Sequence, residues 1–220
     1  PNCNSPSTFL RAVKNCGIKG LVTANNHNCD AGIEGLSKTV EQIKRNGIDN
    51  IGTLDDEIHY VSKNGIKVAI VAFNFISNGL EGDVPLQIIG KYDRERFLSI
   101  ISEAKSEQSD YIIVYAHFGQ MNSLMVRYSQ REEAEFMANN GADIIIGSHP
   151  HTPQRMDIIT TADGKEVPCF YSLGNLFSSM SEMRENRETA IVSLSLSKTE
   201  DAVRAKASYI PVVCKDTDEG

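Results

Sequence analysis

The apolar residues along the chain repeat at helical spacing in some segments and at strand spacing in others. Residues 34–46 place Leu36, Val40 and Ile43 on one face and end before Gly47, as an amphipathic helix does. Similar spacing predicts helices over residues 7–15 and 129–140, and one that begins after an N-cap at Asp93. Short runs rich in β-branched residues predict strands over residues 20–24, 58–62, 66–73, 111–116, 143–147, 189–197 and 208–214.

The order of these elements indicates the fold class. Asn64-Gly65 and Asp163-Gly164 predict hairpin turns, and strands replace helices after Pro153. Strands that alternate with helices and then give way to a strand-rich tail are typical of an α/β layered sandwich with a mixed sheet. Because no repeat, low-complexity tract or linker interrupts the pattern, we expect a single domain over residues 1–220.

Composition narrows the choice of partners. The chain is 40% hydrophobic and 23% charged, with a formal net charge of −7. An acidic chain disfavours non-specific binding to nucleic acid or to an anionic membrane, but bound cations would still allow an anionic substrate. No apolar run approaches the roughly 20 residues that cross a bilayer. The five cysteines are odd in number and form no C-x-x-C pair, which favours free thiols over a disulfide framework or a zinc ribbon.

Polar residues of the kind that bind metals follow three of the predicted strands. They are Asn26-His27, His117 and His149-Pro150-His151. The carboxyl ends of strands are where open α/β sheets place their sites. His59 is the only histidine elsewhere, and we interpret it as an ordinary surface or edge residue of a hairpin strand.

The spacing of these histidines favours a metal site. His149 and His151 can reach two neighbouring ions, or two faces of one ion, and Pro150 stiffens the loop between them. An H-x-H pair alone is weak evidence, but together with His117 and Asn26-His27 it makes metal binding the better hypothesis. Imidazole and amide ligands suit Mn, Fe or Zn better than Ca.

Asp30 follows His27 by three residues, within a predicted turn. A carboxylate at that spacing can accept the imidazole N–H and fix its tautomer, which suits a general acid. Alternatively, Asp30 only caps the turn before Gly32. The spacing leaves both interpretations open. The chain has no nucleophile elbow, dinucleotide fingerprint, P-loop or H-E-x-x-H motif.

Four motifs, in this order, resemble the CapA-like (PGA_cap) proteins of bacterial capsule and poly-γ-glutamate synthesis. The resemblance runs from about residue 7 to residue 210, and the motifs are Ala24-Asn25-Asn26-His27 with Asp30-x-Gly32, Ala116-His117-Phe118-Gly119, residues 141–154 with Gly147-Ser148-His149-Pro150-His151, and Tyr171-Ser172-Leu173-Gly174-Asn175.

This resemblance implies a branch of the calcineurin-like metallophosphoesterases, whose fold is a four-layer α/β/β/α sandwich with mixed sheets. It implies that Asn26, His117, His149 and His151 bind divalent metal ions, two in a complete site. It also implies that His27, paired with Asp30, assists the leaving group.

Two features depart from the family pattern. Nothing before Asn25 supplies the family's amino-terminal D-x-H or Gly-Asp motif or its second acidic motif, and Met121 stands where a glutamate is usual. We therefore expect an amino-terminally truncated domain that lacks the first strands and has an incomplete metal site. In the full-length protein, the resemblance implies extracytoplasmic, membrane-anchored placement in a polymer-synthesis complex; this chain by itself is expected to be soluble.

Two functions fit these observations. One is metal-dependent hydrolysis of a phosphoester or similar bond within capsule or poly-γ-glutamate biosynthesis. The other is a non-catalytic component of a surface-polymer synthesis or export machine that binds polymer or metal. An anionic polymer or a phosphoester is the expected partner, and nucleic acid is not. Residues 78–90, which could shape the pocket, carry no pattern that identifies a substrate.

Overall fold

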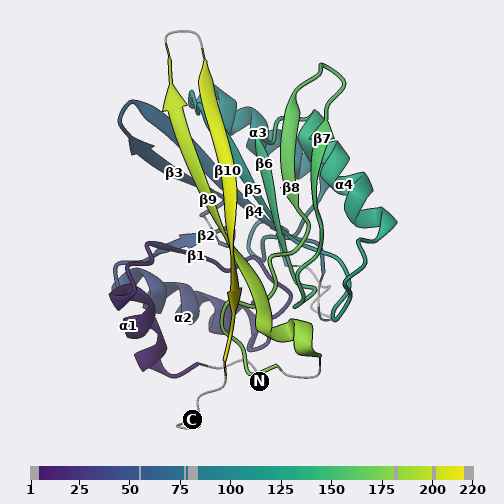
Figure 1. Cartoon of the computed structure of the whole chain (residues 1–220). Coiled ribbons are helices and arrows are strands. Elements are labelled where there is room, and N and C mark those ends of the chain that lie inside the picture. The colour runs from purple at the N-terminus through teal and green to yellow at the C-terminus, as the bar shows by residue number, and fades with distance from the viewer. Residues whose placement is uncertain are drawn as a thin grey trace.

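The computed structural model describes residues 5–54, 56–76, 78, 84–180, 183–199 and 202–215. Helices and strands alternate over the first two thirds of the chain, and strands dominate the rest (Figure 1). The elements are α1 (Ser7–Asn15), β1 (Gly20–Val22), α2 (Gly32–Arg45), β2 (Asp49–Ile51), β3 (Ile58–Lys63), β4 (Ile66–Asn74), α3 (Arg94–Ser106), β5 (Tyr111–His117), α4 (Tyr128–Asn139), β6 (Ile144–Ser148), β7 (Met156–Thr160), β8 (Glu166–Phe170), the 3-10 helix η1 (Arg184–Arg187), β9 (Glu188–Lys198) and β10 (Val203–Val213).

A six-stranded mixed sheet organises the molecule, in the strand order β3-β4-β5-β6-β8-β7. The four inner strands are parallel, and the edge strands β3 and β7 run antiparallel to their neighbours. The register places His117 beside Asn74 of β4 on one side and Ser148 of β6 on the other. Three strands therefore end level with one another, and the loops that follow them start from one edge of the sheet.

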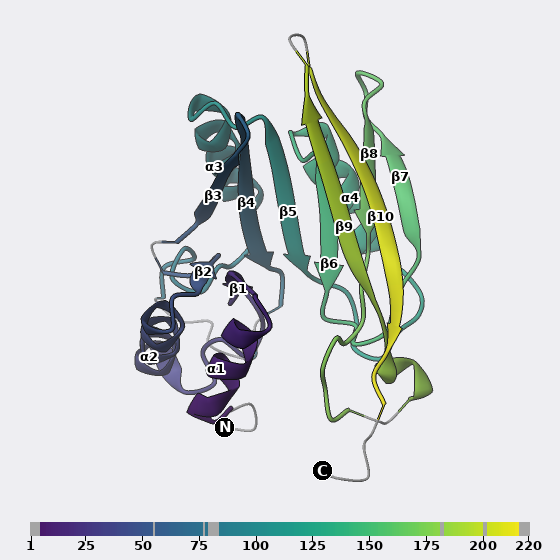
Figure 2. The same ribbon diagram turned by 60° about the vertical axis from the view of Figure 1, so that its left-hand side comes forward.

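Two small sheets cover one face of the large sheet. The pair β1-β2 is parallel and the pair β9-β10 is antiparallel. In Figure 2, β9-β10 lies in front of the large sheet and α3 and α4 lie behind it, while β1-β2 lies below β3 and β4, with α1 and α2 beneath it. Val22 of β1 and Ile51 of β2 pack in one apolar cluster with Ala72 of β4. The result is the α/β/β/α layering that the family resemblance implies.

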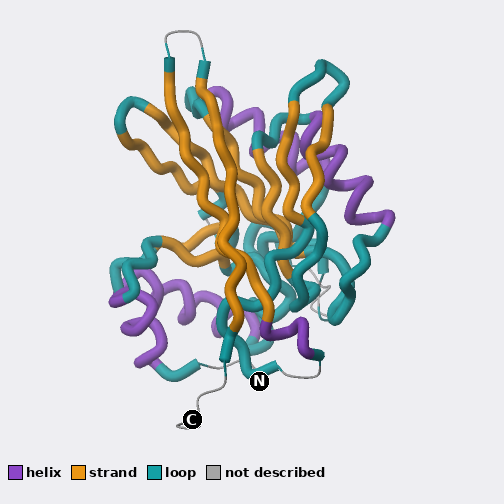
Figure 3. Tube along the Cα trace, in the orientation of Figure 1, coloured by secondary structure: helices purple, strands orange, loops and turns teal. Residues whose placement is uncertain are grey.

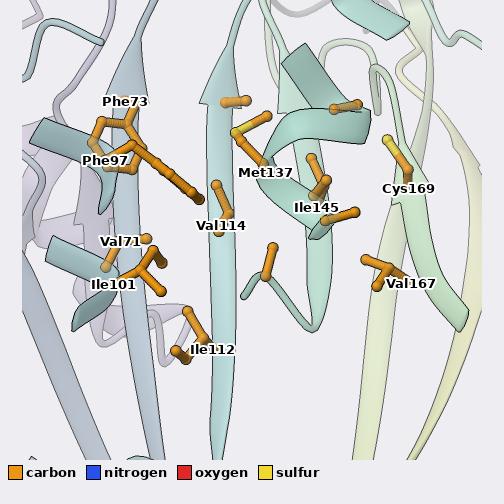
Figure 4. Packing of buried hydrophobic residues seen from close by; sticks show 14 of the residues in the cluster. Val71, Phe73, Phe97, Ile101, Ile112, Val114, Met137, Ile145, Val167 and Cys169 are labelled. Carbon is orange, nitrogen blue, oxygen red and sulfur yellow. The ribbon is translucent and has the colours of Figure 1, made fainter. Parts of the chain in front are cut away.

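Alternation along the inner strands builds the core between the large sheet and its helices. Ala69, Val71 and Phe73 of β4 point toward α3 and α4, where they pack with residues such as Phe97 and Met137 (Figure 4). Burying an apolar side chain of this size contributes about 1.5–3 kcal/mol. On the opposite face, the buried Tyr111, Ile144 and Phe170 pack against apolar residues of β9 and β10.

Most of the predicted elements are present with ends shifted by one or two residues, but β10 begins at Val203, five residues before the predicted start. Asp93 caps α3 by accepting a hydrogen bond from the Arg96 backbone N–H at 3.0 Å. Asn64 and Gly65 have φ of 52° and 74°, as the predicted hairpin turn requires. The predicted fold class is confirmed, but the pattern did not indicate β2, a three-residue strand that pairs with β1.

Two further expectations concern cysteines and membrane spans. Cys16, Cys29, Cys169 and Cys214 are free thiols, and Cys3 lies outside the described residues. Across the described part of the chain, no helix has both the length and the apolar character needed to span a bilayer.

Candidate functional site

The loops at the carboxyl edge of the sheet bring Asn26 and His117 into contact. In Figure 3 these loops gather below the lower ends of the strands. The His117 Nε2 atom lies 2.9 Å from the Asn26 Oδ1 atom, although the two residues are 91 positions apart. On its other side, the His117 Nδ1 atom lies 2.9 Å from the Ser148 hydroxyl. Because the Asn26 oxygen can only accept, His117 donates from Nε2 in this contact, and a bound ion would have to take the place of that proton.

His149 and His151 lie next to this pair. The ring centroids of His117 and His149 are 5.0 Å apart, and those of His149 and His151 are 6.0 Å apart. The structure thus brings together the four residues that the sequence selects as metal ligands. Their role as ligands stays a prediction.

Hydrogen bonds fix which ring nitrogens remain available. His151 donates from Nδ1 to the Asn175 side-chain oxygen at 2.8 Å, because that oxygen can only accept, and its Nε2 is then free to bind an ion. His149 is different: its Nδ1 atom is buried and has no hydrogen-bond partner among the described residues. A buried polar atom without a partner is costly. A metal ion would remove that cost.

The loop that carries these two histidines has an unusual backbone. His149 has φ of 98° and His151 has φ of 61°, in the region that favours glycine. Such conformations cost about 1–3 kcal/mol each and persist only where the surroundings impose them.

A network of asparagines imposes this conformation. Asn186, whose exposed fraction is 1%, donates to the His151 carbonyl at 3.1 Å and to the Asn122 side chain at 3.0 Å. Asn122 donates its backbone N–H to the Pro150 carbonyl at 2.8 Å. Asn175, which orients the His151 ring, donates to the Asn186 carbonyl at 3.1 Å. The loop is therefore held from both its backbone and its side chains.

Two of the imidazoles are neutral in this setting. Burial, reinforced by the neighbouring histidines, lowers the pKa of His117 to about 3. Burial, followed by the influence of His151 and His27, lowers the pKa of His149 to about 4. Neutral imidazole is the form that binds metals.

His27 and Asp30 form the pair that their spacing predicts. The His27 Nδ1 atom lies 2.8 Å from the Asp30 carboxylate, and the two side chains are 43% and 25% exposed. The carboxylate thus contacts the ring, so the Nε2 atom of His27 is left to face a substrate. The role of His27 as an acid stays a prediction.

An open hollow of about 440 Å³ adjoins this pair, lined by His27 and Asp30 together with Thr23, Asn25 and Lys38 among others. It offers space for a substrate group beside the His27 ring.

Sequence reasoning missed several residues of the site. Asn78 accepts a hydrogen bond from the Asn26 side chain at 3.2 Å, and its amide nitrogen lies 3.4 Å from His27 Nδ1. Ser148, Asn175 and Asn186 support the histidines. Ser148 and Asn175 lay within recognised motifs, but neither was given a role; Asn78 and Asn186 lay outside them, and single asparagines in loops carry no spacing signal. Residues 79–83 of the segment that was expected to shape the pocket lie outside the described residues.

The donors present form only part of a metal site. Within the ranges that the structure describes, no three His, Cys, Asp or Glu side chains are placed to hold one ion. The chemistry of three imidazoles and an amide, and the unpartnered His149 nitrogen, fit a metal. Further donors would be needed to complete its coordination. His59 takes no part: it lies on the edge strand β3, 3.7 Å from Asp49.

Comparison with known proteins identifies the family. Residues 1–180 match the family described as bacterial capsule synthesis protein PGA_cap. This chain belongs to the PGA_cap family. The predicted membership in this CapA-like family is therefore confirmed.

Two curated PGA_cap relatives are similar over much of the chain. The chain is 31% identical over 196 residues to the PGA biosynthesis protein CapA of Bacillus subtilis (strain 168), covering 86% of this chain and 50% of the relative. It is 31% identical over 177 residues to the capsule biosynthesis protein CapA of Bacillus anthracis, covering 76% of this chain and 41% of the relative. The chain thus spans half or less of the length of these relatives.

Solved structures agree on the fold. The 5′-nucleotidase precursor of Thermus thermophilus matches with a TM-score of 0.63 at 13% identity, covering 94% of this chain and 41% of that one. The NAD nucleotidase of Haemophilus influenzae matches with a TM-score of 0.62 at 17% identity, covering 94% and 37%. The calcineurin-like phosphoesterase YfkN of Bacillus subtilis matches with a TM-score of 0.50 at 17% identity, covering 91% and 66%. This PGA_cap chain therefore has the calcineurin-like phosphoesterase fold.

Proposed function

We propose that this chain carries a metal-dependent hydrolase site for a phosphoester-type bond, acting in capsule or poly-γ-glutamate biosynthesis. One observation carries the proposal: the buried, unpartnered Nδ1 atom of His149 lies within a cluster of neutral imidazoles. Family membership supports the biological process, and the fold supports the class of chemistry.

Asn26, His117, His149 and His151 would hold the divalent ions, with Mn, Fe or Zn as candidates. When bound, such ions supply Lewis acidity and an activated water at neutral pH. Asn175 and Asn186 would keep the His151 ring and its loop in the binding orientation.

His27 would act as the general acid. Since its Nδ1 atom bonds to Asp30, the proton for transfer is held at Nε2. As the bond to the leaving oxygen breaks, that oxygen would take the Nε2 proton, and the oxygen of water would be added to the phosphorus. The water would release one proton to solvent, and His27 would take up a proton from solvent before the next turnover. The hollow beside His27 and Asp30 would receive the departing group.

A specific observation favours the second candidate, a non-catalytic component that binds polymer or metal. The described residues contain no three-residue group of His, Cys, Asp or Glu placed for one ion. Met121, 52% exposed, also lies where the family usually has a glutamate. Under this candidate the same pocket would bind an anionic polymer without turnover.

Aryl-phosphate hydrolysis and metal content, measured on the same samples, test the proposal. We expect the chain to bind no more than one ion tightly and to hydrolyse p-nitrophenyl phosphate slowly, with activity lost in EDTA and restored by Mn²⁺ or Zn²⁺. His149→Ala should abolish both properties, and His59→Ala, outside the site, should leave both unchanged. The full-length Bacillus subtilis relative provides the comparison for a complete protein.

Each other outcome has a definite meaning. Metal binding without turnover would support the second candidate. Two tightly bound ions with full activity in this chain would show that further ligands lie among residues assigned here to structure. The absence of both metal binding and turnover would refute the proposed site.

A further inference from the structure

Large apolar side chains are exposed in the two loops that follow β5 and β8. They are Met121, Leu124, Met125, Leu176 and Phe177, and their exposed fractions run from 47% to 83%. The stretches that carry them, residues 119–126 and 171–181, contain no Asp, Glu, Lys or Arg, although the chain is 23% charged. Exposed apolar side chains in uncharged surroundings of this kind mark a surface that binds an apolar group.

Hydrogen bonds hold the first of these loops against the loop that carries the two neighbouring site histidines. Gln154 donates to the Ser123 carbonyl at 2.8 Å and to the Met125 carbonyl at 3.0 Å. Asn122 donates its backbone N–H at 2.8 Å to the carbonyl of Pro150, which lies between the histidines. The apolar side chains of the first loop therefore extend from a backbone whose position beside the site is fixed.

The second loop adjoins the same site. Phe177 lies two positions after Asn175, whose side-chain oxygen accepts a hydrogen bond from the His151 ring. The side chain of Asn175 donates to Asn186, and Asn186 donates to the side chain of Asn122 in the first loop. The two loops are thus joined through one residue, and both border the His151 end of the site.

The other end of the site is polar. Asn26 contacts His117, and the His149 ring lies next to that of His117. The His151 ring follows, next to that of His149. The hollow beside His27, at the Asn26 end, is lined mainly by polar side chains. A phosphate group held at this row of residues would have a polar hollow at one end and the apolar loops at the other.

We propose that the substrate is a phosphoester of two different alcohols. A polar alcohol leaves into the hollow beside His27, and a hydrocarbon alcohol stays on the phosphate and binds against Met121 and Phe177. The inference rests on the proposed function, since it names the substrate class of that same site. The oxygen of water replaces the polar alcohol on phosphorus, so the products are that alcohol and the phosphate monoester of the hydrocarbon alcohol. Met121 stands where the family usually has a glutamate, and a carboxylate there would resist burial against hydrocarbon.

Binding measured apart from turnover tests this substrate class. Octylphosphonate and methylphosphonate share an anionic group and differ in the hydrocarbon, and calorimetric titration in Mn²⁺ gives the ratio of their affinities for the chain. Burial of two or three methylenes, about fourfold each, should make octylphosphonate bind about 10- to 60-fold more tightly. Met121→Gln combined with Phe177→Ser should lower this affinity ratio to about threefold or less.

A pair of diesters extends the test to turnover. Methyl p-nitrophenyl phosphate and octyl p-nitrophenyl phosphate release the same p-nitrophenolate, so only the alcohol that stays on the phosphate differs. We expect kcat/KM to be about 10- to 60-fold higher for the octyl diester in the wild type. This preference should be lost in the Met121/Phe177 variant.

A matched control removes a methionine and an aromatic residue from another exposed apolar surface. Met156 of β7 and Tyr209 of β10 line a groove of about 580 Å³, and their exposed fractions are 46% and 57%. Met156→Gln combined with Tyr209→Ser should leave the affinity ratio of the two phosphonates at the wild-type value.

The outcomes separate this inference from the proposed function. An affinity ratio that depends on Met121 and Phe177 supports the inference even if neither diester is hydrolysed. The same ratio in the wild type and the Met121/Phe177 variant, a ratio lowered only in the Met156/Tyr209 control, or no binding of octylphosphonate overturns it even if p-nitrophenyl phosphate is hydrolysed rapidly. Equal affinity for the two phosphonates, with binding to phosphatidylcholine vesicles that requires Met121 and Phe177, overturns it in favour of a lipid surface.

Discussion

His149 and His151 lie in a loop that buried side chains hold in place, whereas His27 lies in a turn at the surface. The first loop has two positive φ values and is fixed by Asn186, which is 1% exposed. The second depends on the Asp30 contact and on Asn78, and the His27 side chain is 43% exposed. Ligands need fixed positions, while an acid must meet solvent and substrate. The two halves differ as their proposed roles require, and the following variants test that difference.

The largest effect is expected from His27→Ala. If His27 is the acid, this variant should lower kcat about 10²- to 10⁴-fold and leave metal content nearly unchanged. Its unfolding free energy should also change little, because the side chain is 43% exposed. Steady-state kinetics beside elemental analysis decides the matter, with His59→Ala as the control. Loss of bound metal in this variant would instead show that His27 is a metal ligand. The His27 turn and the His149/His151 loop would then not differ in role.

Asn186→Ala should show the opposite pattern. The substitution removes the hydrogen bonds that Asn186 donates to the buried His151 loop and to the Asn122 side chain, so we expect a loss of about 2–3 kcal/mol in unfolding free energy. Metal affinity should fall about 10- to 100-fold, because the loop is no longer held. Urea denaturation and metal titration measure both quantities. Asn46→Ala, at the partly buried end of α2, removes one hydrogen bond to the Gln42 carbonyl, so it should leave metal affinity unchanged and cost no more than about 1.5 kcal/mol. A loss of metal affinity as large there would show that the effect is not specific to the loop.

The buried histidines His117 and His149 should also make the unfolding free energy depend on pH. The pKa of His117 is lowered to about 3 and that of His149 to about 4, whereas unfolded histidine titrates near pH 6.5. Below about pH 6.5 the two histidines bind protons in the unfolded chain but stay neutral in the folded protein. The unfolding free energy therefore decreases as the pH falls toward 4. Each histidine contributes at most about 1.4 kcal/mol per pH unit.

Urea denaturation in EDTA between pH 6.5 and 5 measures this slope. His117→Gln should make it shallower, and His59→Ala, on the edge strand, should not. A slope that is the same in the His117→Gln variant and the wild type would contradict the neutral state assigned to His117.

Asp30→Asn should have the smallest effect. The amide oxygen can still accept from the His27 ring, but the charge is lost, and an exposed pair of this kind contributes no more than about 1 kcal/mol. We expect kcat to fall about fivefold with no change in stability. A fall as large as that of His27→Ala would mean that the carboxylate takes a direct part in the reaction.

Much of the fold could be predicted because its strands and helices carry strong local patterns. Along β4, apolar residues fill both faces, and α2 shows a clear apolar stripe. The strand β2 could not be predicted: its sequence, Asp-Asn-Ile, has no strand character, and pairing with β1 creates it. Whether a short segment of this kind forms a strand depends on its tertiary contacts.

The candidate site, like the fold, could be predicted only in the parts that carry a local sequence pattern. Histidines at strand ends can be recognised from the sequence, because the apolar strands that precede them carry a clear pattern. The asparagines that hold them are not, because Asn78 and Asn186 reach the site from loops and from η1 at separations of 51 and 35 residues. Their contribution depends on how distant segments pack, and no local pattern records it.

The backbone at His149 and His151 also has a meaning for relatives of this chain. Both positions have the positive φ that glycine adopts without cost, so histidine is tolerated there at the expense of stability. A relative that no longer used the imidazoles would gain by replacing them with glycine or asparagine. If the two imidazoles bind metal as proposed, the residue at each of these positions is a marker that can be read from sequence alone, and it should separate family members that bind metal from those that retain only the scaffold.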